Sequence, residues 1–288
     1  MTPPILAHAG PLLERAQVVF CDVWGVMHNG RTAYAEAGEA LARFRGRGGT
    51  VILVSNAPVP AAGVERVLEK TGVRRDAWDA IVSSGDIALA HIAEKGYRRL
   101  HRIGPAARDS KLFERLPGPN VALAEADAIV CTGLVDDSNE TVKSYGPLID
   151  AGISFALPFV CANPDLVVDV GTKRYLCAGS IAAEYERRGG NVFWAGKPHP
   201  SAYNAAFDRA CELRGSAPDR SAILGIGDAL RTDLAAAQGM GIGALFIASG
   251  IHKDEVLTDG EIDAEKLAAL FAAPEAPPAV AAMTQLRW

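Results

Sequence analysis

The chain has 288 residues, of which 49% are hydrophobic and 22% charged, and its formal net charge at pH 7 is -5. This is the composition of a globular protein with room for two domains. No basic block is present, so nucleic acid is not an expected partner. No apolar run reaches the roughly 18 residues that a membrane-spanning helix needs, and the N-terminal segment lacks the pattern of a signal peptide, so we expect no membrane association.

The cysteines are scattered along the chain and form no CxxC motif. Their number is odd, which argues against a complete disulfide framework. We expect reduced, mostly buried thiols and a cytoplasmic protein. The five are Cys21, Cys131, Cys161, Cys177 and Cys211.

The first predicted strand ends at an acid. The apolar run at 18–21 is followed by Asp22 and then Gly25, which indicates a buried strand that stops at a carboxylate and turns. Helices and strands then alternate, in a pattern typical of a parallel sheet covered by helices on both faces. After a helical lead-in at 1–16, we expect helices at 35–47 and 64–71 and strands at 51–54 and 80–82.

Residues 86–183 have a different texture, with short apolar runs separated by polar loops. Strands are expected at 100–103 and 128–131. Two further apolar runs, 155–160 and 166–170, flank the turn Asn163-Pro164-Asp165. This segment could be a smaller α/β unit of its own.

The alternation of strands and helices returns near residue 191. Strands are expected at 191–195, 222–226 and 243–247, and helices at 202–214, from Asp233 toward Gln238, and at 263–272. The first two of these strands, like those at 18–21 and 51–54, end in polar residues. If all four lie parallel in one sheet, their polar ends meet at one edge, where chemistry collects in such folds.

The polar residues at these strand ends suit phosphoryl transfer. They supply an acid for attack, a hydroxyl and an amide for oxyanions, one cation and further acids for a hard metal ion. Most of them have an ordinary structural explanation as well: a turn or helix cap for Asp22, Ser55, Asn56 and Asp228, and a solvated surface position for Lys197. The set comprises Asp22, Ser55, Asn56, Lys197, Asp228 and Asp233.

The same segments resemble the motifs of the haloacid dehalogenase superfamily, in the class IIA branch of sugar, nucleotide and pyridoxal phosphate phosphatases. DVWGVMHNG resembles the first motif, LVSNAP the second, WAGKPHPSAY the third and GIGDALRTDLAAAQGMG the fourth. VSSGDIAL and CANPD resemble the segments that flank an inserted cap. The resemblance covers nearly the whole chain.

The resemblance implies an α/β fold with a doubly wound parallel sheet and an inserted α/β cap. The core would comprise residues 1–85 and 184–288, and the cap 86–183. A cytoplasmic, Mg²⁺-dependent hydrolase of small phosphate monoesters is implied, with a possible homodimer through the cap. Asp22 would be the nucleophile, Ser55, Asn56 and Lys197 would bind phosphate, and Asp22, the backbone carbonyl of Trp24 and Asp228 would hold Mg²⁺, with Asp233 in support.

One residue departs from the family pattern. Phosphatases of the family carry an Asp two residues after the nucleophile as general acid and base, and this chain has Trp24 there. An indole cannot transfer protons near neutral pH, and loss of a general acid typically costs about 10²- to 10⁴-fold in rate. A dehalogenase-like hydrolase and a non-catalytic protein that binds a phosphorylated ligand therefore remain as alternatives. His28, in the following loop, is a candidate for the missing proton transfer.

Overall fold

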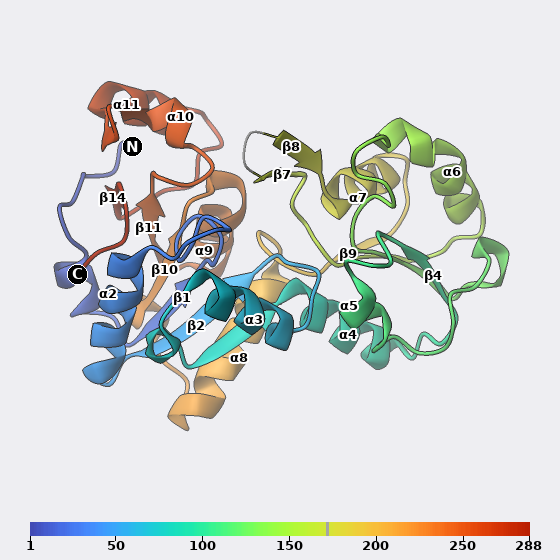
Figure 1. Ribbon diagram of the computed structural model, residues 1–288, viewed down its shortest axis with the longest axis horizontal. Helices are drawn as coiled ribbons and strands as arrows, with labels where there is room; N and C mark the ends of the chain where they lie inside the picture. The colour runs from blue at the N-terminus through green and yellow to red at the C-terminus, as the bar shows by residue number, and fades with distance from the viewer. Residues whose placement is uncertain (171–172) are drawn as a thin grey trace. The chain divides into compact units, whose positions relative to one another are not determined.

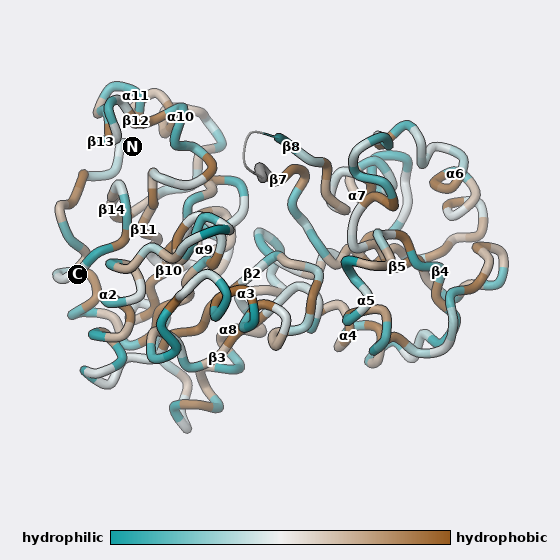
Figure 2. Tube along the Cα trace, in the orientation of Figure 1, coloured by the Kyte–Doolittle hydropathy of each residue, from teal (hydrophilic) through white to brown (hydrophobic). Residues whose placement is uncertain are grey.

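The computed structural model describes residues 1–170 and 173–288, which form two compact units (Figure 1). The first unit comprises residues 1–55, 64–82 and 197–288, and the second comprises 56–63 and 83–196. The domain boundaries expected at 86 and 183 remain a prediction. In the structure, residues 184–196 pack with the second unit. Hydrophobic segments run through both units (Figure 2). Among the described residues, none of the helices is both long and apolar enough to span a bilayer.

The first unit is built on a six-stranded sheet with the order β14-β11-β10-β1-β2-β3. Neighbouring strands from β14 to β2 run parallel. Every residue of β1, β2 and β10 is buried, which explains why their sequences are apolar without alternation. The strands are β1 (Val18–Cys21), β2 (Thr50–Ser55), β3 (Ala80–Ser83), β10 (Ile223–Gly227), β11 (Gly243–Ile247) and β14 (Ala281–Met283).

Helices cover both faces of this sheet (Figure 1). On one face, Tyr203 of α8 packs edge-on against Phe20 of β1 at a centroid distance of 5.2 Å. The helices expected from periodicity are present with shifted ends, and the expected N-terminal lead-in is a single short helix. The helices are α1 (Gly10–Leu13), α2 (Ala35–Gly46), α3 (Ala61–Thr71), α8 (Pro200–Arg214), α9 (Ala235–Met240), α10 (Lys253–Val256) and α11 (Ala264–Phe271), with a small hairpin of β12 (Leu257–Thr258) and β13 (Glu261–Ile262).

The second unit contains a four-stranded parallel sheet with the order β4-β5-β6-β9. Its strands alternate strictly between two cores: Ala128 and Val130 of β5 face α4 and α5, whereas Ile129 and Cys131 face α6 and α7. Separately, β7 pairs antiparallel with β8. The elements are α4 (Ser84–Lys95), β4 (Leu100–Ile103), α5 (Ser110–Phe113), β5 (Ala128–Cys131), α6 (Gly146–Ser154), β6 (Phe159–Cys161), β7 (Val167–Val170), β8 (Lys173–Leu176), α7 (Ala178–Arg187) and β9 (Val192–Trp194).

One expected strand is present but belongs to a different sheet from the one expected. The run at 191–195 was expected to join the sheet of Asp22, but β9 pairs with β6 in the second unit. The register Cys161↔Trp194 places its apolar residues beside β6 and against the helices of that unit. An apolar run shows that a strand is buried and leaves open which sheet buries it.

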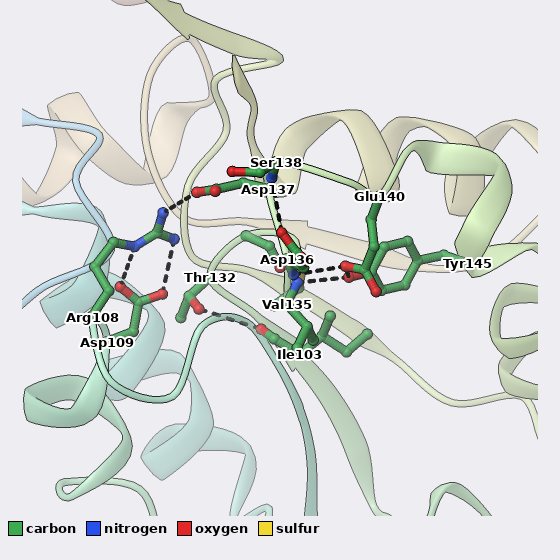
Figure 3. Close-up of polar contacts among 12 residues, drawn as sticks. Ile103, Arg108, Asp109, Thr132, Val135, Asp136, Asp137, Ser138, Glu140 and Tyr145 are labelled. Atoms are coloured by element: carbon green, nitrogen blue, oxygen red, sulfur yellow. Dashed lines mark hydrogen bonds and ion pairs between the residues drawn. The ribbon is translucent and has the colours of Figure 1, made fainter. Parts of the chain in front are cut away.

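The second unit also carries a polar cluster at the carboxyl ends of β4 and β5 (Figure 3). The Arg108 guanidinium donates to both carboxylate oxygens of buried Asp109, at 2.8 and 3.1 Å, and to Asp137 at 3.1 Å. The Thr132 hydroxyl donates to the carbonyl of Ile103 at 3.3 Å. These groups satisfy one another, so we assign the cluster to the stability of the second unit.

Candidate active site

Sheet register brings three of the expected strand ends together. Cys21 lies beside Ile226 of β10 and Leu53 of β2, so the residues that follow these strands share one edge. The Asp22 amide donates to the carbonyl of Ile226 at 2.8 Å, which continues the hydrogen-bond ladder to Asp22. In this register Asp22 lies beside Gly227, and Asp228 is the next residue along, so the two acids lie close together.

Lys197 lies at the centre of this edge. Its side chain is 3% exposed, and its ammonium group donates to Asp22 Oδ1 at 2.6 Å, Asp233 Oδ1 at 2.6 Å and the carbonyl of Val54 at 2.8 Å. Burial alone would lower the pKa of Lys197, but the charges of Asp22 and Asp233 outweigh it and hold the pKa well above the usual range. Lys197 is therefore a buried, charged cation, and the surface-lysine interpretation is excluded.

Three carboxylates gather around this cation. Each of Asp22, Asp228 and Asp233 offers an oxygen within 4.8 Å of the others. Burial, with the neighbouring charges of Asp22 and Asp233, raises the pKa of Asp228 well above its usual range. Burial and the charge of Asp22 raise the pKa of Asp233 to about 6. One ammonium does not balance three acids, so the cluster suits a hard cation with oxygen ligands.

The position of Asp228 depends on two glycines. A Cβ on Gly25 would lie 2.2 Å from Asp228 Oδ2, and one on Gly250 would lie 1.8 Å from the same atom. The amide of Ile251 donates to this oxygen at 2.7 Å. The helix-cap interpretation of Asp228 was wrong, because Ala229 precedes the next helical turn and the carboxylate points to the segment after β11.

The segment after β11 was missed in the sequence. The run at 243–247 was predicted to be a strand, but the segment that follows it, Ser249-Gly250-Ile251, was not considered as part of the active site. β11 is parallel to β10, so its carboxyl end reaches the same edge. The same rule that selected Asp22 and Asp228 could have found this segment.

Asp233 lies in a short π-helical turn, Leu230–Leu234, of a kind often found at functional sites. One carboxylate oxygen accepts from Lys197, and the other accepts from the Ala229 amide at 3.2 Å and the Thr232 hydroxyl at 3.4 Å. A Cβ on Gly227 would lie 2.1 Å from Asp233 atoms, so this close approach requires glycine. These contacts orient Asp233 toward Lys197 and its own turn.

The two residues of the second motif have different surroundings. Ser55 is the buried last residue of β2, next to the carbonyl of Val54 that accepts from Lys197. The Asn56 amide donates to Asp165 Oδ1 at 2.9 Å, and the Ser84 hydroxyl donates to Asn56 Oδ1 at 3.5 Å. Asn56 itself belongs to the second unit and contacts two other residues of that unit, one of them the acid of the CANPD segment.

Trp24 and His28 belong to a loop that folds back on itself. Trp24 pairs with His28 and His28 with Ala33 as isolated bridges, and the Gly25 amide donates to the carbonyl of His28 at 2.9 Å. The two rings meet edge to face at 5.4 Å. His28 is 1% exposed, its Nδ1 accepts from the Gly30 amide at 2.9 Å, and burial lowers its pKa to about 4. An imidazole that is neutral and buried is a poor proton donor at pH 7.

Comparisons with known proteins agree with this arrangement. Residues 19–114 match a model of haloacid dehalogenase-like hydrolases, and residues 194–273 match a related hydrolase-like model. No curated protein matches the chain.

Solved structures resemble the chain over nearly its whole length. A haloacid dehalogenase-like hydrolase from Brucella suis 1330 is 40% identical, with 97% of this chain and 98% of that chain covered and a TM-score of 0.82. A 4-nitrophenylphosphatase from Thermotoga maritima is 21% identical, with coverage of 95% and 96% and a TM-score of 0.69.

A glycerol phosphate phosphatase from Mycobacterium tuberculosis, in complex with calcium, is 21% identical, with 89% of this chain and 76% of that chain covered and a TM-score of 0.64. The similarity to the Thermotoga and Mycobacterium structures establishes the fold. The 40% identity to the Brucella protein, over nearly the whole of both chains, establishes membership of its family. The resemblance found in the motifs is confirmed, and the chain belongs to the haloacid dehalogenase-like family of hydrolases.

Proposed function

We propose that this hydrolase is a Mg²⁺-dependent phosphatase of small phosphate monoesters that works through an aspartyl-phosphate on Asp22. The observation that carries the proposal is the Lys197 ammonium, held between Asp22 and Asp233 at 2.6 Å from each, with Asp228 in the same cluster. A nucleophilic carboxylate, a buried cation and further acids are the groups that phosphoryl transfer needs.

The donor set fits a divalent cation. Asp22 and Asp228 supply carboxylate oxygens, and the backbone of Gly25, which follows the Trp24 carbonyl, lies against Asp228. We infer that Asp22, the Trp24 carbonyl and Asp228 hold Mg²⁺, with Asp233 orienting Lys197. Bound there, the ion would offset negative charge on the phosphoryl group. The Mycobacterium tuberculosis neighbour is a complex with calcium, which supports the proposal of a divalent cation.

The residues of the chain then have separate roles. A carboxylate oxygen of Asp22 attacks phosphorus, and the bond from phosphorus to the ester oxygen breaks, with its electron pair leaving on the alcohol oxygen. Lys197, Ser55 and Asn56 bind the phosphoryl oxygens. Water then hydrolyses the acyl-phosphate and regenerates Asp22. Trp24 cannot protonate the leaving oxygen, so weakly basic leaving groups should react best.

Two other functions make different predictions. Binding of a phosphorylated ligand without turnover is favoured by one observation, the Trp24 side chain at the position of the general acid. A dehalogenase would not need the acids beyond Asp22, and the cluster of Asp22, Asp228 and Asp233 therefore counts against it. The chemistry of the cluster places phosphatase activity first.

The test is a panel of phosphate monoesters assayed with Mg²⁺ and with EDTA, for the parent protein and for Asp22→Asn. Hydrolysis that requires Mg²⁺ and disappears in Asp22→Asn is expected, because an amide cannot form the acyl-phosphate. Circular dichroism of the variant should match that of the parent. Turnover retained by Asp22→Asn would show that Asp22 is not the nucleophile, and phosphate binding without turnover in the parent would establish the binding function.

Cellular location and assembly belong to the same proposal. All five cysteines are unbonded, four of them buried, which supports a reducing, cytoplasmic environment. A homodimer through the second unit stays a prediction, which sedimentation of the full chain would test.

A further inference from the structure

The loop after β1 carries an aromatic residue that is close to the proposed nucleophile along the backbone. Trp24 follows Asp22 by two residues, a separation of at most about 7 Å along the backbone. Its side chain is 41% exposed, although its neighbours Val23, Val26, Met27 and His28 are all buried. An exposed indole within such a buried loop is available for contact with a ligand.

The ring is held in place by its own loop. A Cβ on Gly30 would lie 2.4 Å from Cη2 of Trp24, so the six-membered ring rests against the Gly30 backbone. The edge-to-face contact with His28, at 5.4 Å, supports the ring on another side. The Gly30 amide in turn donates to His28 Nδ1, which fixes both supports relative to each other. A ring fixed in this way contacts a ligand with little loss of conformational entropy.

We propose that Trp24 is a specificity residue that stacks on the leaving group, and that the substrates are phosphate monoesters of aromatic alcohols. This inference rests on the proposed phosphatase function. An indole face prefers a flat, polarisable ring over a saturated one of the same size. The same residue leaves the site without a proton donor, which also favours aromatic alcohols, because a phenol with a pKa of about 10 leaves without protonation more easily than an aliphatic alcohol.

The two consequences of Trp24 can be separated by measuring binding without turnover. The probes are phenyl phosphate and cyclohexyl phosphate, which have the same number of carbon atoms but differ in aromaticity. Their affinities for Asp22→Asn in Mg²⁺ are compared by calorimetry, where leaving-group basicity has no influence. We expect phenyl phosphate to bind roughly 2- to 12-fold tighter, the range of an aromatic pair.

Matched variants in the Asp22→Asn background show whether the indole is the cause. Trp24→Leu should remove the preference, and Trp24→Phe should keep most of it. Gly30→Ala should weaken it by displacing the ring, whereas Gly48→Ala, with a similar φ of +88° against +84° and open space around its Cβ, should not. Trp288→Leu is the control for the removal of an indole elsewhere in the chain, since the Trp288 ring packs against the Arg43 guanidinium. This variant should keep the preference for phenyl phosphate.

The outcomes are distinct. Equal affinity for both probes, or a preference that survives Trp24→Leu and Gly30→Ala, would overturn the role of Trp24. If the parent protein hydrolyses both esters under either result, the phosphatase proposal stands and only this inference falls. If neither ester binds or is hydrolysed, both fall together. Trp24→Phe and Gly30→Ala keep the test decisive should Trp24→Leu fail to fold.

Discussion

Replacing Lys197 by Met tests whether the buried ammonium holds the acid cluster together. An ammonium has three donors, and all three are used: toward Asp22, Asp233 and the Val54 carbonyl, at 2.6, 2.6 and 2.8 Å. Met preserves the length of the side chain and removes the charge. Because the acids would then lie buried without a counter-charge, the free energy of unfolding should fall by about 3–5 kcal/mol.

The assay is urea unfolding in EDTA, followed by tryptophan fluorescence. Trp24, Trp78 and Trp288 lie in the first unit, so the signal reports mainly on the unit that contains the cluster. Lys70→Met in α3 is the control: Lys70 is exposed, and the change should stay within about 0.5 kcal/mol. Adding Asp233→Asn to Lys197→Met should recover part of the loss, since it removes one uncompensated acid.

Lys197→Met and the parent should also differ in their response to divalent cations. Saturating Mg²⁺ should restore more stability to Lys197→Met than it adds to the parent, because the ion replaces the missing positive charge; a ligand at 100 times its dissociation constant adds about 2.7 kcal/mol. If Lys197→Met loses no more stability than Lys70→Met in EDTA, the ammonium does not compensate the acids, and the electrostatic account of the site is refuted.

Three other predictions address the loop and the acids. Trp24→Asp should raise kcat/KM for alkyl phosphate esters toward the roughly 10²-fold scale of general-acid catalysis, and rapid parental turnover of such esters with no gain in the variant would contradict it. Gly250→Ala should weaken Mg²⁺ affinity in calorimetry, because its Cβ would lie 1.8 Å from Asp228 Oδ2, and unchanged affinity would argue against Asp228 as a ligand. Burial lowers the pKa of His28 from 6.5 to about 4, so its neutral form stabilises the fold above pH 6.5 and up to about 3 kcal/mol is lost as the pH falls toward 4. His28→Gln should flatten that part of the urea-unfolding profile, and an equal slope in both proteins would assign the pH dependence elsewhere.

The strands that carry Asp22 and Asp228 were predictable because both are short, continuous apolar runs that end in an acid. Burial on both faces leaves no alternation, and the polar end marks the edge of the sheet. Lys197 was expected to follow a strand of the Asp22 sheet, but β9, the strand before it, belongs to the other sheet, and its ammonium nevertheless contacts Asp22 and Asp233. Periodicity reports burial, while strand order depends on contacts between residues far apart in sequence.

Two features of the site had weak signals in the sequence. Gly25 and Gly250 leave space for the Asp228 carboxylate, where a Cβ would collide with it. Glycines are common in loops, so the sequence does not show which side chain lies close to them. The engagement of Asn56 with Asp165 joins residues more than a hundred positions apart, beyond the reach of any local pattern. Local chemistry predicted the reactive groups, and the tertiary fold supplied the residues that place them.

The short link that precedes Lys197 limits how the second unit of this enzyme could be exchanged for that of another protein. Only Ala195 and Gly196 separate the last strand of the second unit from the lysine that holds the acids of the first. Adding one residue to this link would lengthen it by up to about 3.5 Å, more than the 2.6 Å that joins the ammonium to Asp22. A second unit transplanted from another protein must therefore keep the length of this connection as well as the fold of its own sheet.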